Sequence, residues 1–185
     1  MDRHSVDQRE LWDVAESLAD AARGATLEHF RKPQELSTES KRSDFDPVTI
    51  ADRNSEAAMR RIIEERRPDD GILGEEFGEK PSKNGLTWVL DPIDGTRSYI
   101  SGTPTWGVLI ALSDADGPFL GVVDQPYIQE RFCGGAGRAD VVGPLGKRHL
   151  RARDTAELSD ATLFTTSQKW AQLTRVLPFV GWQNK

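Results

Sequence analysis

The sequence has little of several features that mark whole classes of protein. Of its 185 residues one is a cysteine, Cys133, so the chain cannot form an internal disulfide, which predicts a reducing compartment. No apolar run approaches the ~18 residues of a membrane span, and residues 1–7 are too charged for a signal peptide. A net charge of −6 argues against nucleic-acid or anionic-membrane partners. We therefore expect a soluble, cytoplasmic protein.

Histidine is also scarce, and the three histidines lack the spacing of metal ligands. The arginine pairs at residues 60–61 and 66–67 lie on a predicted helix that also carries Glu56, Glu64 and Glu65. Mixed charges on one helix are typical of a solvated face, and we interpret these residues in that way rather than as a nucleic-acid surface.

What the sequence does contain begins with two amphipathic helices. An apolar stripe with helical spacing runs from Leu11 to Phe30, and a second predicted helix runs from about Ala51 to Arg67, where Pro68 stops it. Both stripes are interpreted as packing surfaces.

Short apolar runs that are typical of strands follow the helices. They lie at residues 72–73, 87–90, 106–112, 119–123 and 130–133, with a mobile segment expected at residues 78–85. The Gly-rich residues 134–146 predict a loop and a boundary, beyond which residues 150–153 and 161–166 resemble strands of a second unit. The pattern predicts an α/β protein in which two helices pack on a mainly antiparallel sheet. We expect one α+β domain at residues 1–147 and an incomplete C-terminal domain at residues 148–185.

The stretch with the most chemical content follows the run Trp88 to Leu90, and reads Asp91-Pro92-Ile93-Asp94-Gly95-Thr96. Glu75 follows residues 72–73, so its carboxylate would meet that of Asp91 if the two predicted strands are neighbours. Carboxylate oxygens are the ligands that Mg²⁺ prefers, and a divalent cation would remove the repulsion between them. A turn with solvated acids is the alternative for an isolated Asp-Pro-x-Asp, but the accompanying Gly-Thr and Gly-Glu-Glu favour a metal site.

The Gly95–Thr96 turn offers backbone N–H groups to an anion such as phosphate. A bound cation would lower the pKa of a water molecule that attacks phosphorus and would neutralise the phosphoryl oxygens. Asp52, early in the second helix, would orient Thr96, whose hydroxyl would hold that water. Taken alone, Asp52 also fits an ordinary acid at a helix N-terminus. These residues predict a Mg²⁺-dependent phosphate monoester hydrolase.

Three segments resemble the inositol monophosphatase family of Mg²⁺-dependent phosphomonoesterases: residues 46–52, residues 74–76 and residues 88–96. The resemblance implies a layered α+β sugar-phosphatase fold, an αβαβα sandwich. The metal ligands that it implies are Glu75, Asp91, the backbone carbonyl of Ile93, and Asp94. It further implies that Thr96 and Asp52 position the attacking water, that the Gly95 and Thr96 amides hold the phosphate, and that Lys41 lies near the site.

A narrower resemblance, to the histidinol-phosphatase branch, is carried by residues 94–102, 106–107, 121–126 and 161–167. It favours histidinol phosphate as substrate, and thus a role in histidine biosynthesis, over an inositol, sugar or other polyol phosphate. Arg97 stands where the broader family has another residue, and it would contact the substrate phosphate, the neighbouring subunit or a structural carboxylate. Family members commonly dimerise, so a homodimer is a further expectation.

The resemblance covers residues 7–167 and then stops. Family members are longer, and their second domain carries a Trp-Asp-x-Ala-type motif whose aspartate completes the metal site; this chain has no such motif. We therefore expect a C-terminally truncated chain with impaired activity and an exposed apolar patch, and a non-enzymatic fragment or residual gene product is the alternative. A haloacid-dehalogenase-type phosphatase is a weaker rival, because its two aspartates are separated by one residue, whereas Pro92 and Ile93 both separate Asp91 from Asp94.

Overall fold

The computed structural model describes residues 7–32, 38–40 and 47–162. The chain divides into two compact units, residues 1–150 and residues 151–185. Residues 151–156 have no regular structure, so the strand expected at residues 150–153 is wrong, and a short 3-10 helix, η2 (Leu158–Asp160), follows. Residues 163–166 of the second expected strand, and all residues of the expected apolar patch, lie outside the described residues.

Two long helices form where the apolar stripes predicted them. Helix α1 (Gln8–His29) begins after Asp7, whose side chain accepts the Arg9 N–H at 2.9 Å. Helix α2 (Ile50–Arg66) begins with a capping box in which Thr49 and Asp52 satisfy each other's backbone N–H groups. No helix in the described part of the chain is long and apolar enough to cross a membrane.

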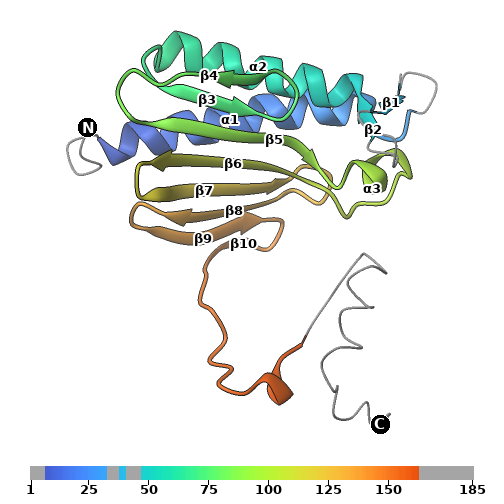
Figure 1. Cartoon of the computed structure of the whole chain (residues 1–185). Helices are drawn as coiled ribbons and strands as arrows, with labels where there is room; N and C mark the ends of the chain where they lie inside the picture. Colours follow the sequence, from blue (N-terminus) through green and yellow to red (C-terminus); the bar gives the residue numbers. More distant parts are fainter. Residues whose placement is uncertain (1–6, 33–37, 41–46, 163–185) are drawn as a thin grey trace. The chain divides into compact units, whose positions relative to one another are not determined.

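Within the described residues, eight strands form one sheet in the order β10-β9-β8-β7-β6-β5-β3-β4 (Figure 1). Strands β3 and β5 run parallel, and the other neighbours in this sheet are antiparallel. The strand bounds are β3 (Gly71–Gly74), β4 (Gly78–Lys80), β5 (Thr87–Asp94), β6 (Gly107–Asp114), β7 (Gly117–Gln125), β8 (Glu130–Gly135), β9 (Arg138–Gly143) and β10 (Gly146–His149). A separate pair, β1 (Thr38–Ser40) and β2 (Pro47–Thr49), precedes α2.

The Gly-rich residues 134–146 belong to the sheet, and the prediction of a loop there is wrong. Gly135, Ala136 and Gly137 all have positive φ, and these three residues make the tight turn between β8 and β9. Gly146 also has positive φ, at the turn into β10. The glycines that suggest a loop are therefore turn residues of two β-hairpins.

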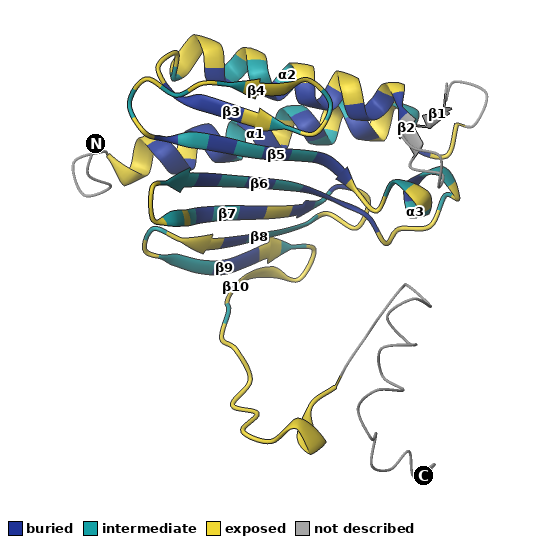
Figure 2. Ribbon diagram, viewed as in Figure 1, coloured by how far each residue is buried: buried dark blue, intermediate teal, exposed yellow. Residues whose placement is uncertain are grey.

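One face of the sheet carries the helices and the main core (Figure 2). Helix α1 packs on α2 and contacts β5, β6 and β7, and α2 contacts β5. Burial alternates along β5, where Trp88 and Leu90 are buried and Val89 is half-buried. The side chains that build this core include Leu11, Leu18, Met59, Ile63, Ile72, Trp88, Leu112 and Val122.

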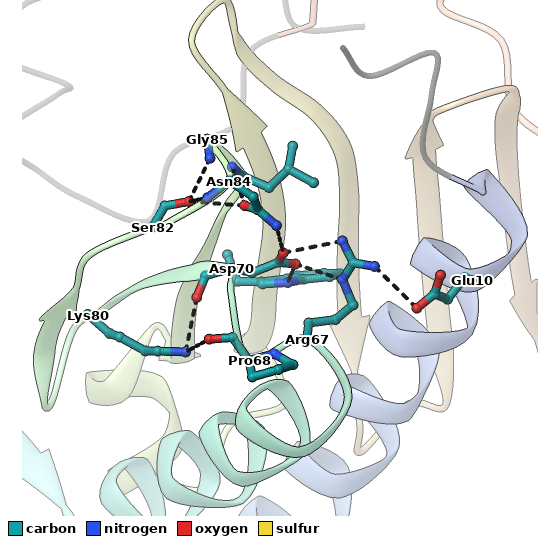
Figure 3. Close-up of polar contacts among 10 residues, drawn as sticks. Glu10, Arg67, Pro68, Asp70, Lys80, Ser82, Asn84 and Gly85 are labelled. Atoms are coloured by element: carbon teal, nitrogen blue, oxygen red, sulfur yellow. Dashed lines mark hydrogen bonds and ion pairs between the residues drawn. The ribbon is translucent and has the colours of Figure 1, made fainter. Parts of the chain in front are cut away.

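Asp70, at the start of β3, is the buried acceptor of a polar network (Figure 3). Its carboxylate accepts from the Arg67 guanidinium at 3.0 Å, from Asn84 Nδ2 at 2.7 Å and from the Trp88 indole at 2.9 Å. Lys80 Nζ donates to the backbone carbonyl of the same residue at 3.1 Å. Residues 78–85 are thus strand β4 and a bonded turn, and the expectation of a mobile segment is wrong.

Replacing Asp70 with asparagine should lower the free energy of unfolding by about 2–4 kcal/mol, because the half-buried Arg67 guanidinium loses the buried one of its two charged partners and keeps only Glu10. Urea denaturation would measure the loss. The neighbouring Asp69→Asn is the matched control, since Asp69 is 64% exposed and its contact with Lys83 is 3.6 Å long. Equal losses in the two variants would contradict the importance of burial here.

Candidate functional site

The parallel strands β3 and β5 bring Glu75 and Asp91 to neighbouring positions near the C-terminal ends of these strands. In the register, Gly74 of β3 lies beside Leu90 of β5, and the Glu75 N–H donates to the Leu90 carbonyl at 3.3 Å. Each carboxylate residue therefore follows directly after a paired residue, and the Glu75 carboxylate lies close enough to Asp91 to raise the pKa of the Asp91 carboxyl. The predicted neighbourhood of these two strands is confirmed.

A β-bulge in β5 turns Asp94 to the side of Asp91. Asp91 pairs with Leu109 of β6, and Asp94 pairs with Gly107, so the three steps on β5 face two steps on its partner. In a regular strand, residues three apart point to opposite faces. The extra residue restores the same face, and Pro92, which has no N–H, occupies the bulge where no ladder bond is required.

Among the three acidic residues, Asp91 is the one whose carboxyl has a clearly raised pKa. Burial first, then the charges of Glu75 and Asp94, raise the pKa of its carboxyl to about 7, while a hydrogen bond from the Ile93 backbone opposes the change. Its Oδ1 atom is buried without a hydrogen-bond partner among the described residues. A buried carboxylate oxygen with no donor, beside two further carboxylates, fits a cation.

The described residues do not already hold three acidic, histidine or cysteine side chains in the close arrangement of a formed metal site. Glu75 and Asp94 are exposed to solvent, so their side chains have room to turn toward a cation. The donor set consists of carboxylate and carbonyl oxygens, which matches a hard ion such as Mg²⁺.

The turn after β5 depends on Gly95. This residue has φ 89° and precedes helix α3 (Thr96–Ile100), and a Cβ atom there would lie 3.0 Å from the Thr105 carbonyl oxygen. The Thr96 hydroxyl donates to the Ile93 carbonyl at 3.1 Å, which places that hydroxyl and that carbonyl together beside the aspartates.

A second, smaller core supports this turn. It consists of Phe30, Ala51, Ile93, Tyr99 and Trp106. The Tyr99 and Trp106 rings meet edge to face with centroids 4.9 Å apart, and the Tyr99 hydroxyl donates to the Thr26 carbonyl at 2.6 Å. The end of α1 and the start of α2 are thereby fixed against the turn.

Asp52 is buried at the start of α2, where its carboxylate accepts from Thr49 N at 2.8 Å and Thr49 Oγ1 at 2.6 Å. Its charge, after burial, contributes to raising the pKa of the Tyr99 hydroxyl, so the carboxylate faces the smaller core. The capping role is thus shown, while a role toward Thr96 stays a prediction. Arg97 is exposed on α3, and Lys41 lies outside the described residues.

Glu56 is a site residue that the sequence did not reveal. The charge pattern of α2 predicts a solvated face for it, and this prediction is wrong: its side chain is fully buried. Its carboxylate accepts from the backbone N–H groups of Glu76 at 2.6 Å and Phe77 at 3.2 Å. Arg60 Nε completes the arrangement at 2.7 Å. Four-residue spacing of Glu and Arg is the usual pattern of a surface pair, so the sequence offered no signal of burial.

The chain is similar to known proteins of one family. Residues 7–175 match the model of the inositol monophosphatase family. A histidinol-phosphatase of Chlorobaculum parvum is 48% identical over 119 residues, which cover 64% of this chain and 45% of the relative. A histidinol-phosphatase of Mycobacterium tuberculosis is 39% identical over 162 residues, which cover 86% of this chain and 62% of the relative.

A solved structure described as an inositol monophosphatase from Zymomonas mobilis superposes with a TM-score of 0.58 at 36% identity, covering 83% of this chain and 56% of that one. The matched regions therefore span between 45% and 62% of the length of these proteins. Since the family model covers the helices, the sheet and the acidic turn alike, the chain belongs to the inositol monophosphatase family.

Proposed function

We propose that this chain carries the metal- and phosphate-binding part of a Mg²⁺-dependent phosphate monoester hydrolase. The observation that supports it most is the buried, unpartnered Oδ1 of Asp91 beside the carboxylates of Glu75 and Asp94. Residues 1–147 would form the metal- and phosphate-binding domain and residues 148–185 the start of a second. A homodimer is part of the same proposal.

Glu75, Asp91, Asp94 and the Ile93 carbonyl would hold the cation. When bound, it would neutralise charge on the phosphoryl oxygens and lower the pKa of the water that attacks phosphorus. The water oxygen forms the new bond to phosphorus, the ester P–O bond breaks, and the alcohol leaves with a proton.

The chain's own groups would orient the reactants around that cation. The Gly95 and Thr96 amides would hold the phosphate, aided by Lys41 and Arg97, and Thr96 with Asp52 would position the water. The Thr96 hydroxyl already lies 3.1 Å from the Ile93 carbonyl, next to the proposed ligands.

We propose histidinol phosphate as the substrate, because the two curated relatives described above carry histidinol-phosphatase names. The Zymomonas mobilis structure is named an inositol monophosphatase, so inositol monophosphate is the second candidate.

Phosphate release from histidinol phosphate should depend on Mg²⁺ and disappear in Asp94→Asn. Asp94 is exposed, so its loss should remove a ligand without unfolding the chain. Released phosphate should be measured with and without Mg²⁺, with inositol monophosphate as the comparison substrate.

Asp116→Asn, an exposed aspartate in the turn between β6 and β7, is the control and should keep the activity. Faster release from inositol monophosphate would overturn the choice of substrate. A folded, Mg²⁺-binding protein that releases no phosphate would indicate a catalytically inactive member of the family.

A further inference from the structure

The buried carboxylate of Glu56, on α2, accepts hydrogen bonds from the turn that contains Glu75. Glu56 Oε2 accepts the N–H of Glu76 at 2.6 Å and its Oε1 accepts that of Phe77 at 3.2 Å, so both residues after Glu75 are tied to one side chain. We propose that Glu56 is a positioning residue which sets the place of the Glu75 carboxylate relative to Asp91. The inference rests on the proposed function, in which Glu75 is a metal ligand.

The packing around Glu56 indicates a fixed arrangement. A Cβ atom at Gly74 would lie 1.9 Å from Glu56 Oε1, so the strand residue before Glu75 approaches the carboxylate as closely as glycine alone permits. On the other side, Arg60 Nε donates to Glu56 Oε1, and the Arg60 guanidinium also binds the Gly78 carbonyl and lies 5.9 Å from the Phe77 ring. Arg60 therefore binds both the Glu56 carboxylate and Gly78, the first residue after the turn.

Backbone donors as well as a charge hold this carboxylate, and that distinguishes it from a simple ion pair. Isolated salt bridges contribute little to stability, whereas charge-assisted bonds from successive amides fix the course of a chain. Glu75 lies between Gly74, which is paired in β3, and the two amides that donate to Glu56. The backbone on both sides of Glu75 is therefore held, and this restricts the position of its Cα atom. Groups that orient metal ligands in this way typically change metal affinity 10- to 100-fold when they are removed.

Asp70 provides a matched comparison at the opposite end of β3. Like Glu56, it is a buried carboxylate paired with an arginine, here Arg67 at the C-terminal end of α2, but its other side-chain donors are Asn84 and Trp88 rather than the amides that follow Glu75 (Figure 3). A purely structural role predicts similar behaviour of the two carboxylates, and a positioning role predicts that they differ in metal affinity.

The experiment compares Glu56→Gln with Asp70→Asn in the full chain. Titration calorimetry with Mg²⁺ should show affinity reduced about 10-fold or more in E56Q and changed by less than about twofold in D70N. Thermal melts identify a temperature at which both variants are folded. In the metal-free protein, hydrogen exchange of the Glu76 and Phe77 amides should accelerate in E56Q and not in D70N.

Mg²⁺ affinity in folded E56Q equal to that of the unchanged protein would overturn the inference while leaving the proposed function intact. Absence of Mg²⁺ binding in the unchanged protein would instead overturn the proposed function, and amide exchange would still report whether Glu56 holds the turn. If E56Q does not fold, Gly74→Ala replaces it, because the new methyl group displaces the carboxylate and should reduce the affinity similarly.

Discussion

Asp91→Asn should stabilise the metal-free protein at pH 8 and at the same time abolish its Mg²⁺ binding. The pKa of this carboxyl is about 7 in the folded chain against 3.8 as its ordinary value, so above pH 7 the folded state must ionise a buried group. The resulting loss of stability is absent below pH 3.8, grows as the pH rises, and is complete above pH 7. A neutral amide removes it and gains roughly 1–3 kcal/mol.

Thermal melts in chelator at pH 8 should show a rise of about 2–4 °C per kcal/mol in the variant, shrinking as the pH approaches 4. Calorimetric titration should show Mg²⁺ affinity lowered at least about 100-fold. Asp116→Asn is the control for the thermal effect, because that side chain is exposed in the turn between β6 and β7 and does not contribute to the raised pKa of Asp91, so it should give no comparable gain. A variant that is less stable at pH 8, or that binds Mg²⁺ normally, would contradict this account of Asp91.

Asp124→Ala should be among the most destabilising single substitutions in the sheet. Asp124 is completely buried on β7, where it accepts from Arg23 of α1 at 2.6 Å and from Arg131 of β8 at 2.8 Å. Removing it leaves two arginines without their shared partner and removes the ion pair between α1 and β7. We expect a loss of about 3–5 kcal/mol in the free energy of unfolding.

Chemical denaturation would measure that loss, with Asp20→Ala as its counterpart in the same network. Asp20 also binds Arg131, at 2.7 Å, but it is 70% exposed, so its removal should cost less than about 1 kcal/mol. If Asp20→Ala proved as damaging as Asp124→Ala, burial would not be the source of the effect.

The fold was predictable where a local pattern decides it. Apolar periodicity located both long helices and the strands around Asp91, and the spacing of Glu75 and Asp91 required only that their strands be neighbours. The β9 and β10 hairpins were missed because glycine serves a tight turn and a linker alike. Sequence alone does not distinguish these uses.

The acidic residues of the candidate site were predictable from the sequence, but the residue that holds the turn beside them, Glu56, was not. The capping box of Thr49 and Asp52 lay within reach of sequence rules, as did the need for Gly95. The role of Glu56 depends on which helix face meets β3, and that is set by packing between distant segments. A helical Glu with an Arg four residues later looks the same on a surface and in a core.

The bulge at Pro92 and Ile93 makes chain length in β5 matter more than residue identity. Deleting one residue there would remove the bulge: the two aspartates would stay on one face of a regular ladder, but the extra backbone between them, from which the Ile93 carbonyl reaches the Thr96 hydroxyl, would be lost. Replacing either residue would keep the register and therefore the meeting of the two aspartates. We therefore expect related sequences to differ here by substitutions, and to keep two residues between the aspartates.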